Sequence, residues 1–381
     1  MSKFIKDQVK DIAISGIRQF NQKANDVEGV IRLTLGELDF DTFPHIKEAV
    51  YQAAQNNKTR YTPNAGIEEL RKKISLRYEH YNMTDIIVTV GTTEGLAIII
   101  KSVIGPGDEV IIPTPGYVGY EPLVHIEGGV VREIDLTTSN FRITKEQLEA
   151  AYNENTKAIL ITNPNNPTGI ILNEDEMTTI RDFVLEHDIL LIVDEVYSEI
   201  DFYGKFRSFS RYKELKDNML VLDGFSKSHA MTGFRIGYIL GDELTIKELL
   251  KTHQYTVTSA TSISQYAALA AHDDDSTQIM NELRKRREYL CDIFQREQIK
   301  CICPEGAFYV FIDISAYSKS SIAFCERLLY RYKVAAIPGE SFLGRHADYI
   351  RISYAIDMDD LKEAIERLMA FIRERKEKTA T

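Results

Sequence analysis

Short apolar segments recur between about residues 85 and 240, and each is followed by a polar or glycine-rich turn and then by a longer segment with helical spacing. Apolar runs that lack period-two alternation are typical of strands covered on both faces. Strands that alternate with helices in this way predict an α/β layer with a largely parallel sheet. The seven runs span residues 86–90, 109–113, 130–134, 158–162, 189–193, 219–223 and 236–240.

A different pattern follows the acidic stretch HDDDS at 272–276. A long charged helix is expected there, followed by strands within 306–314, 334–339 and 349–355, a helix near 320–332 and a last helix. This grouping predicts a smaller α+β domain. The N-terminal forty residues show no strand pattern and are expected to pack with it. We therefore expect a large domain over 45–275 and a small domain made of 1–44 and 276–381.

Composition and charge narrow the class of protein. The chain has 381 residues, 44% hydrophobic and 27% charged, which is enough for a substantial core and two domains. Its net charge of −11 argues against a nucleic-acid or anionic-membrane partner. With no apolar segment of bilayer length, we expect a cytoplasmic protein. The four cysteines form no CxxC pair, so reduced thiols and no metal site are expected.

Polar residues follow several of the predicted strands, at the edge where ligands bind in open α/β sheets. Gly91, Thr92 and Thr93 are expected to begin a helix, and the N–H groups and hydroxyls there could bind a phosphate. An ordinary helix N-cap without a ligand has the same sequence pattern. Tyr117 follows two prolines and is expected either to pack or to stack on a flat ligand. Asn166 lies in the rigid loop NPNNPTG, which is either structural or a ligand contact.

Two further strand ends carry charge. Asp194 follows five apolar residues, and a buried carboxylate there needs a cationic partner. Lys227, in DGFSKSHAMTGFRIGY, is either an exposed lysine or a buried nucleophilic amine, and the small residues around it favour close approach of a ligand. One molecule would satisfy all five strand ends, namely pyridoxal 5′-phosphate, with its phosphate, flat ring, protonated ring nitrogen and aldehyde.

The lysine segment, with Gly224 three residues before Lys227, Ser226 next to it and A-M-T-G-F-R-I-G after it, also resembles a family signature. Together with NPNNPTG, DEVY and RISYA in that order, it resembles the pyridoxal-phosphate-dependent aminotransferases of class I/II, fold type I, over essentially the whole chain. The resemblance implies that Lys227 is the Schiff-base lysine and that Asp194 pairs with the pyridinium nitrogen. It assigns the remaining cofactor contacts to Tyr197 and Asn166 at the ring O3′, Tyr117 on the ring face, and Thr92, Thr93, Ser226 and Arg235 at the phosphate.

The same resemblance implies the substrate and subunit contacts. Arg351 would clamp the substrate α-carboxylate, with the backbone near Gly36 closing over it. Tyr61 would reach the phosphate of the other subunit's cofactor, which makes a homodimer the expected working unit. Gly224 stands where many members have a phosphate-binding serine, so this phosphate cup is expected to be one hydroxyl short, with Ser226 or backbone N–H groups compensating.

The implied reaction transfers an amino group from an L-amino acid to a 2-oxo acid, with 2-oxoglutarate as the expected acceptor, by ping-pong kinetics. The pattern resembles bacterial enzymes that act on N-acetyl-LL-diaminopimelate, aspartate or aromatic amino acids, and Arg18 is a candidate for a distal carboxylate. Two alternatives use the same scaffold: a C–S β-lyase and a cofactor-sensing regulator. Regulators of that kind usually carry a fused DNA-binding region, whereas here the enzyme pattern begins within the first forty residues.

Overall fold

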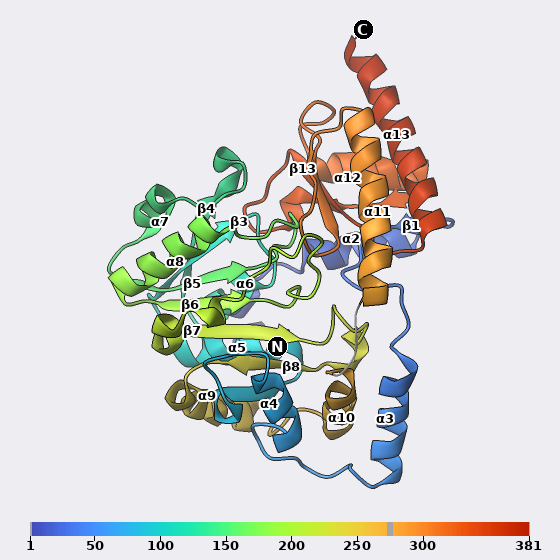
Figure 1. The fold of residues 1–381 in the computed structure, drawn as a ribbon. Helices are drawn as coiled ribbons and strands as arrows, with labels where there is room; N and C mark the ends of the chain where they lie inside the picture. The colour runs from blue at the N-terminus through green and yellow to red at the C-terminus, as the bar shows by residue number, and fades with distance from the viewer. Residues whose placement is uncertain (1, 273–276, 381) are drawn as a thin grey trace.

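The computed structural model describes residues 2–272 and 277–380, and its largest element is a seven-stranded sheet (Figure 1). The strand order is β2-β8-β7-β6-β5-β3-β4, and only β8 runs antiparallel to its neighbours. All seven predicted runs are confirmed as strands to within two residues at each end. Their bounds are β2 (Ile86–Thr89), β3 (Glu109–Thr114), β4 (Val130–Asp135), β5 (Thr156–Thr162), β6 (Leu190–Asp194), β7 (Met219–Gly224) and β8 (Gly237–Leu240).

Both faces of this sheet are buried, which explains why its strands lack alternation. Ile159 and Ile161 of β5 enter the core on one face, and Leu160 between them enters the core on the other. Helices α4 (Glu68–Ser75), α7 (Lys145–Ala151), α8 (Glu174–His187) and α10 (Ser262–Ala271) contribute to the first core, and α5 (Gly91–Val103), α6 (Tyr120–Ile126) and α9 (Glu243–Thr256) contribute to the second. The prediction of two covered faces is wrong for β4, where only Ile134 is buried, because this strand lies at the sheet edge.

A second, antiparallel sheet of order β12-β13-β10-β9 forms near the C-terminus, with α11, α12 and α13 gathered around it (Figure 1). Phe20 and Ala24 of α2 enter its core, so the N-terminal segment packs with the C-terminal part. The domain limits stay a prediction, and the one between 275 and 276 lies outside the described residues. The bounds are α2 (Gly16–Asn25), β9 (Cys301–Ile302), β10 (Tyr309–Asp313), β12 (Ile337–Pro338), β13 (Tyr349–Ser353), α11 (Thr277–Arg296), α12 (Ser321–Tyr332) and α13 (Met358–Ala380).

The N-terminal segment also contains a strand that the sequence did not predict. β1 (Ile31–Arg32) pairs in parallel with β11 (Val334–Ala335). A strand of two residues is too short to carry a periodic pattern, and only its distant partner defines it. The remaining helices of the described chain are α1 (Asp7–Lys10), α3 (Pro44–Gln55) and a set of short 3₁₀ turns, which includes η6 (Thr232–Phe234).

The cysteines differ from the expectation of four reduced thiols. Cys291 of α11 and Cys303 form a disulfide with their Cα atoms 6.0 Å apart, whereas Cys301 and Cys325 are free. The expectation is wrong for the first pair because α11 packs beside the residues that follow β9, a contact that cysteine spacing does not reveal. Within the described residues, none of the helices combines the length and the apolar character needed to cross a membrane.

Candidate active site

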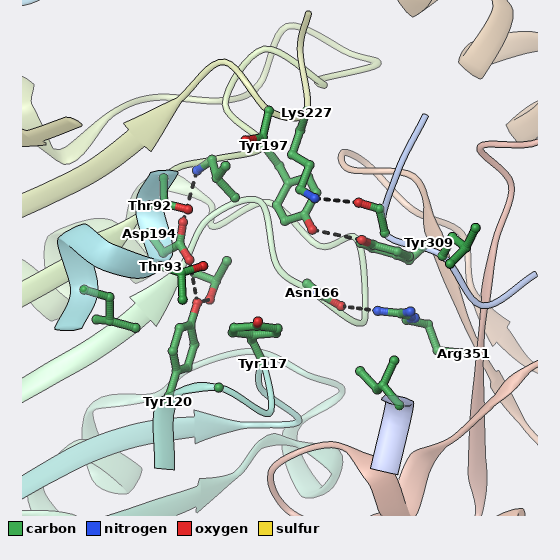
Figure 2. A pocket seen from close by; sticks show the side chains of 18 of the residues that line it. Thr92, Thr93, Tyr117, Tyr120, Asn166, Asp194, Tyr197, Lys227, Tyr309 and Arg351 are labelled. Carbon is green, nitrogen blue, oxygen red and sulfur yellow. Dashed lines mark hydrogen bonds between the residues drawn. The ribbon is translucent and has the colours of Figure 1, made fainter. Parts of the chain in front are cut away.

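A cavity of about 250 Å³ opens between the carboxyl ends of the large sheet's strands and the small sheet (Figure 2). Of the residues that the sequence analysis proposed as cofactor or substrate contacts, all line this cavity except Tyr61 and Arg18. The structure therefore brings together side chains from segments spread over more than 300 residues of sequence. These residues are Gly36, Thr92, Thr93, Tyr117, Asn166, Asp194, Tyr197, Ser226, Lys227, Arg235 and Arg351.

Asp194 is the last residue of β6 and is buried. One of its carboxylate oxygens accepts a hydrogen bond from the Tyr120 hydroxyl at 2.9 Å, and the other accepts one from the Val196 N–H at 3.2 Å. Burial raises the pKa of Asp194, and these hydrogen bonds oppose that shift. Among the described residues it forms no salt bridge with a lysine or arginine, although the charge of Lys227 acts on it and opposes the rise in its pKa. A buried carboxylate in this state is matched to a cationic ligand atom.

The N-terminus of α5 and Arg235 form a cluster of donors on one side of the cavity. Gly91 opens the helix with a φ of +73°, and a Cβ atom there would lie 2.5 Å from Nη2 of Arg235. Glycine at this position therefore allows the guanidinium to approach the helix start. Thr92 and Thr93 follow, and Arg235 also donates a hydrogen bond of 3.1 Å to the Thr232 carbonyl. Helix N–H groups beside a guanidinium are suited to a phosphate dianion.

The packing of β7 against β8 explains the glycine at position 224. A Cβ atom on Gly224 would lie 2.9 Å from the Cα of Gly237 and 3.0 Å from the carbonyl oxygen of Ile236. A serine at this position would therefore require the backbone of β8 to move. Ser226, two residues further on, is buried and lines the cavity.

Lys227 follows β7 and points into the cavity, where its Nζ donates a hydrogen bond of 2.5 Å to the Gly36 carbonyl (Figure 2). Burial lowers the pKa of Lys227 to about 8, while the nearby Glu37 carboxylate raises it and the guanidinium of Arg235 lowers it further. The amine is thus unprotonated in a much larger fraction of molecules near neutral pH than an exposed lysine would be.

Tyr309 of β10 is a cavity residue that the sequence analysis missed. Its hydroxyl lies 2.9 Å from that of Tyr197, and a Cβ atom at Gly36 would lie only 2.7 Å from it. Burial raises the pKa of both tyrosines, so both hydroxyls are neutral donors. The run GAFYVFIDI reads as a buried strand, and nothing in its pattern distinguishes this tyrosine from core residues.

Arg351 of β13 is buried and is held by the chain on two sides. Its Nη1 donates to Oδ1 of Asn166 at 3.0 Å, and its Nη2 donates to the Thr34 carbonyl at 2.8 Å. Its guanidinium lies over the rings of Tyr309 and Phe342, 4.2 and 5.0 Å from their centroids. Burial lowers the pKa of Arg351, and its Nε has no hydrogen-bond partner within the described chain. The two hydrogen bonds therefore fix the orientation of the Arg351 guanidinium, and its Nε–H remains as a donor for a ligand.

Residues from α2 and the segment after β1 also line the cavity, and the sequence analysis did not propose them. Ile17, Asn21 and Thr34 belong to this set. Oδ1 of Asn21 and Oγ1 of Thr34 are buried without a partner among the described residues. Arg18 is exposed and does not line the cavity, but its charge acts on Tyr117 in the cavity wall, where it opposes the rise in pKa that burial causes.

The two tyrosines proposed as cofactor contacts differ in position. Tyr117 lines the cavity and contacts Tyr120 edge to face, with ring centroids 5.3 Å apart. A Cβ atom at Gly119 would lie 2.5 Å from the ring of Tyr117, so glycine at position 119 leaves room for that ring. Tyr61 lies outside the cavity with 89% of its surface exposed. Its role across a subunit interface stays a prediction.

The sheet order, the lysine after β7 and the aspartate at the end of β6 define the chain as an enzyme of fold type I. Solved structures agree with this assignment. The aspartate aminotransferase from Thermus thermophilus with maleate is 33% identical with a TM-score of 0.91, over 96% of this chain and 99% of that one. The aromatic aminotransferase from Pyrococcus horikoshii OT3 is 33% identical with a TM-score of 0.87, over 94% and 99%.

Sequence comparisons identify the family. The family model described as aminotransferase class I and II matches residues 28–368. A Bacillus subtilis (strain 168) protein named "Probable N-acetyl-LL-diaminopimelate aminotransferase" is 36% identical over 100% of this chain and 99% of its own length. The aromatic-amino-acid aminotransferase 2 of Thermococcus litoralis is 34% identical over 98% and 99%. The chain therefore belongs to the aminotransferase class I and II family and is a transaminase. These relatives give the β-lyase alternative no support.

Proposed function

We propose that this chain is a pyridoxal-phosphate-dependent aminotransferase that moves the amino group of an L-amino acid to 2-oxoglutarate. The observation that carries the proposal is the amine of Lys227, whose pKa burial lowers to about 8, in one cavity with Asp194 and Arg351. An amine of this kind is both a nucleophile and a base near neutral pH.

The cavity residues fit pyridoxal 5′-phosphate. The helix start at Gly91, with Thr92 and Arg235, supplies donors for the phosphate, and the buried carboxylate of Asp194, which forms no salt bridge within the described residues, matches a protonated ring nitrogen. Tyr117 offers a ring at the cavity wall for stacking. When bound, the cofactor supplies an aldehyde for the lysine amine and a ring that stabilises negative charge at the substrate α-carbon.

The chain's own residues have distinct tasks in this proposal. Arg351 clamps the substrate α-carboxylate, because it is a buried guanidinium already fixed by two hydrogen bonds. Asn166 uses its amide oxygen for Arg351, which leaves its amide nitrogen to donate to the cofactor together with the hydroxyl of Tyr197. Nζ of Lys227, once free, takes the proton from the substrate Cα. The Gly36 carbonyl accepts a hydrogen bond from the lysine amine and orients it.

The amino donor is proposed to be N-acetyl-LL-diaminopimelate, aspartate or an aromatic amino acid. Relatives with all three kinds of name match this chain over 90% or more of its length. The cavity lining supports a donor with a polar distal end, since a buried oxygen of Asn21 and one of Thr34 have no hydrogen-bond partner among the described residues. The charge of Arg18 acts on Tyr117, and this arginine would bind a distal carboxylate of the substrate. The Thermus thermophilus structure is named for maleate, which is a dicarboxylate.

The working unit is proposed to be a homodimer. Arg235, among the donors proposed for the phosphate, is exposed to solvent, as is Tyr61, which lies outside the cavity. Tyr61 of the partner subunit would add a hydroxyl at the phosphate and cover this opening. Two observations support the proposed homodimer: the side chains of Arg235 and Tyr61 are both exposed, and the family resemblance implies a tyrosine shared between subunits.

The proposal is tested with the purified chain. Protein supplied with pyridoxal 5′-phosphate should be yellow, and borohydride should attach the cofactor to the peptide that contains Lys227. A panel of amino donors should then be assayed with 2-oxoglutarate. The values of kcat/KM should be highest for one of the three proposed classes of donor, namely acidic, acylated or aromatic amino acids. The absence of a chromophore, or attachment to a different lysine, would overturn the proposal. Release of ammonia and pyruvate without amino transfer would indicate a lyase instead.

A further inference from the structure

The segment that carries Gly36 is fastened to the loop after Lys227 by three hydrogen bonds. Lys227 Nζ donates to the Gly36 carbonyl at 2.5 Å, and the Thr42 hydroxyl donates to the Ala230 carbonyl at 2.6 Å. The third bond involves Glu37, which lies between Gly36 and Thr42 in the sequence. Its Oε1 accepts a hydrogen bond from the Thr232 hydroxyl. Glu37 is thus the neighbour of the residue that binds the lysine amine, and its carboxylate is fixed by a residue five positions after that lysine.

Thr232 links two charges of opposite sign. Its hydroxyl binds the carboxylate of Glu37, and its carbonyl accepts a hydrogen bond of 3.1 Å from Nη1 of Arg235. The same turn, η6, therefore orients an anion and a cation that both act on Lys227. A structural role alone does not require a carboxylate at position 37, since any side chain with an acceptor atom could bind the threonine hydroxyl.

We propose that Glu37, held by Thr232, is a positioning residue that provides the outer negative charge for the amine of Lys227. The inference rests on the proposed function, because it concerns the amine that the reaction uses. Four charged groups of the described chain act on this amine: Glu37 and Asp194 are negative, and Arg235 and Arg351 are positive. The hydroxyls of Tyr197 and Tyr309 are neutral, and the two carboxylates oppose the effect of the two guanidinium groups on the amine.

The consequence concerns the pH at which the amine accepts a proton. A nearby carboxylate favours the charged ammonium form and raises the pKa of a lysine. Burial and the two arginines lower the pKa of Lys227, so loss of Glu37 should lower it further. The amine of a Glu37 variant would be a more readily available base at lower pH, but a weaker one.

The test measures the lysine directly in the full-length chain freed of cofactor. Competitive acetylation with acetic anhydride over a range of pH, read by mass spectrometry of the Lys227 peptide, gives the midpoint of its titration. The wild-type midpoint should lie near pH 8. Glu37→Gln should lower this midpoint by about half a pH unit or more. Glu37→Asp keeps the negative charge, so its midpoint should stay close to that of the wild type. In 1 M salt, where the screening length is about 3 Å, the difference should shrink.

A matched control and a double variant separate this role from a general charge effect. Asp41 lies four residues after Glu37, and both residues line a shallow surface pocket together with Thr232. Unlike Glu37, Asp41 forms a salt bridge with Lys47 at 3.3 Å. Asp41→Asn should leave the midpoint unchanged. Thr232→Val removes the hydroxyl and should lower the midpoint in the same direction, with no additional shift when it is combined with Glu37→Gln.

An unchanged midpoint in Glu37→Gln would overturn the inference, and so would an equal shift in Asp41→Asn or a fully additive double variant. The readout does not require turnover. Borohydride attachment to another lysine would therefore refute the proposed function and leave the titration result standing, whereas an unmoved midpoint with attachment at Lys227 would refute this inference alone.

Discussion

Arg351 and Asn166 are 185 residues apart in the sequence, and Nη1 of the arginine donates a hydrogen bond of 3.0 Å to Oδ1 of the asparagine. Arg351 belongs to β13 of the small sheet, and Asn166 lies in the loop after β5 of the large sheet. The second terminal nitrogen binds the Thr34 carbonyl at 2.8 Å, in the segment after β1. One guanidinium therefore ties three parts of the chain together at the cavity wall.

Arg351→Lys should raise KM with a smaller effect on kcat. Lysine keeps the positive charge but loses the planar set of donors that holds Asn166 and the substrate carboxylate together. Loss of one charge-assisted hydrogen bond of about 1.5–3 kcal/mol corresponds to a roughly 10- to 100-fold increase in KM. Steady-state kinetics measure it. Arg345→Lys, an exposed arginine that pairs with Glu121, is the control, and an unchanged KM in Arg351→Lys would assign the carboxylate to another residue.

Lys227→Ala should abolish useful turnover without abolishing cofactor binding. The variant lacks both the covalent attachment and the base, and general acid–base catalysis alone contributes about 10²–10⁴-fold. The donors at Gly91, Thr92 and Arg235 are unchanged, so the cofactor should stay bound and borohydride should no longer attach it. Lys205→Ala, at an exposed lysine paired with Glu305, should behave as wild type. A near-normal rate in Lys227→Ala would disprove the assignment.

Asp194→Asn should stabilise the cofactor-free protein at high pH and weaken its response to cofactor. Burial raises the folded-state pKa of Asp194, so the cofactor-free protein loses stability as the pH rises above the unfolded value of about 3.9. Asparagine cannot ionise and escapes this loss, which we expect to be about 1–3 kcal/mol. Calorimetry at pH 4 and pH 8 should show the Tm difference only at pH 8. A less stable variant at pH 8 would mean that the carboxylate is ionised there without cost.

The sequence predicted the large sheet and most of its cavity residues because both rest on local signals. Buried parallel strands read as apolar runs, and residues such as Asp194 and Lys227 stand out where such a run ends in a charge. The resemblance added Arg351 and Gly36, whose local surroundings carry no such signal. The parallel strand order then brings these strand ends to one edge of the sheet, so correctly predicted strands place their terminal residues in one cavity.

The residues that were missed depend on contacts between distant segments. Tyr309 lies in a strand that reads as core, and its hydroxyl becomes a site group only because Gly36 and Tyr197 approach it. Asn21 lines the cavity because α2 packs on the small sheet's core. The strand β1 and the Cys291–Cys303 disulfide likewise require partners that neither spacing nor periodicity identifies.

Gly224→Ser tests whether the missing hydroxyl of the phosphate cup is excluded by packing. The new Cβ atom would lie 2.9 Å from the Cα atom of Gly237, the first residue of β8, and 3.0 Å from the carbonyl oxygen of Ile236 just before it, and such backbone atoms yield less than a flexible side chain. Overpacking of this kind should lower the free energy of unfolding by about 1–3 kcal/mol. Gly233→Ser, where no atom lies within 4 Å of the new Cβ, should change it by less than about 0.5 kcal/mol. Denaturant unfolding measures both variants, and cofactor titration should show no gain in affinity for Gly224→Ser. A variant at position 224 that is as stable as wild type and binds the cofactor more tightly would show that β8 can accommodate the serine.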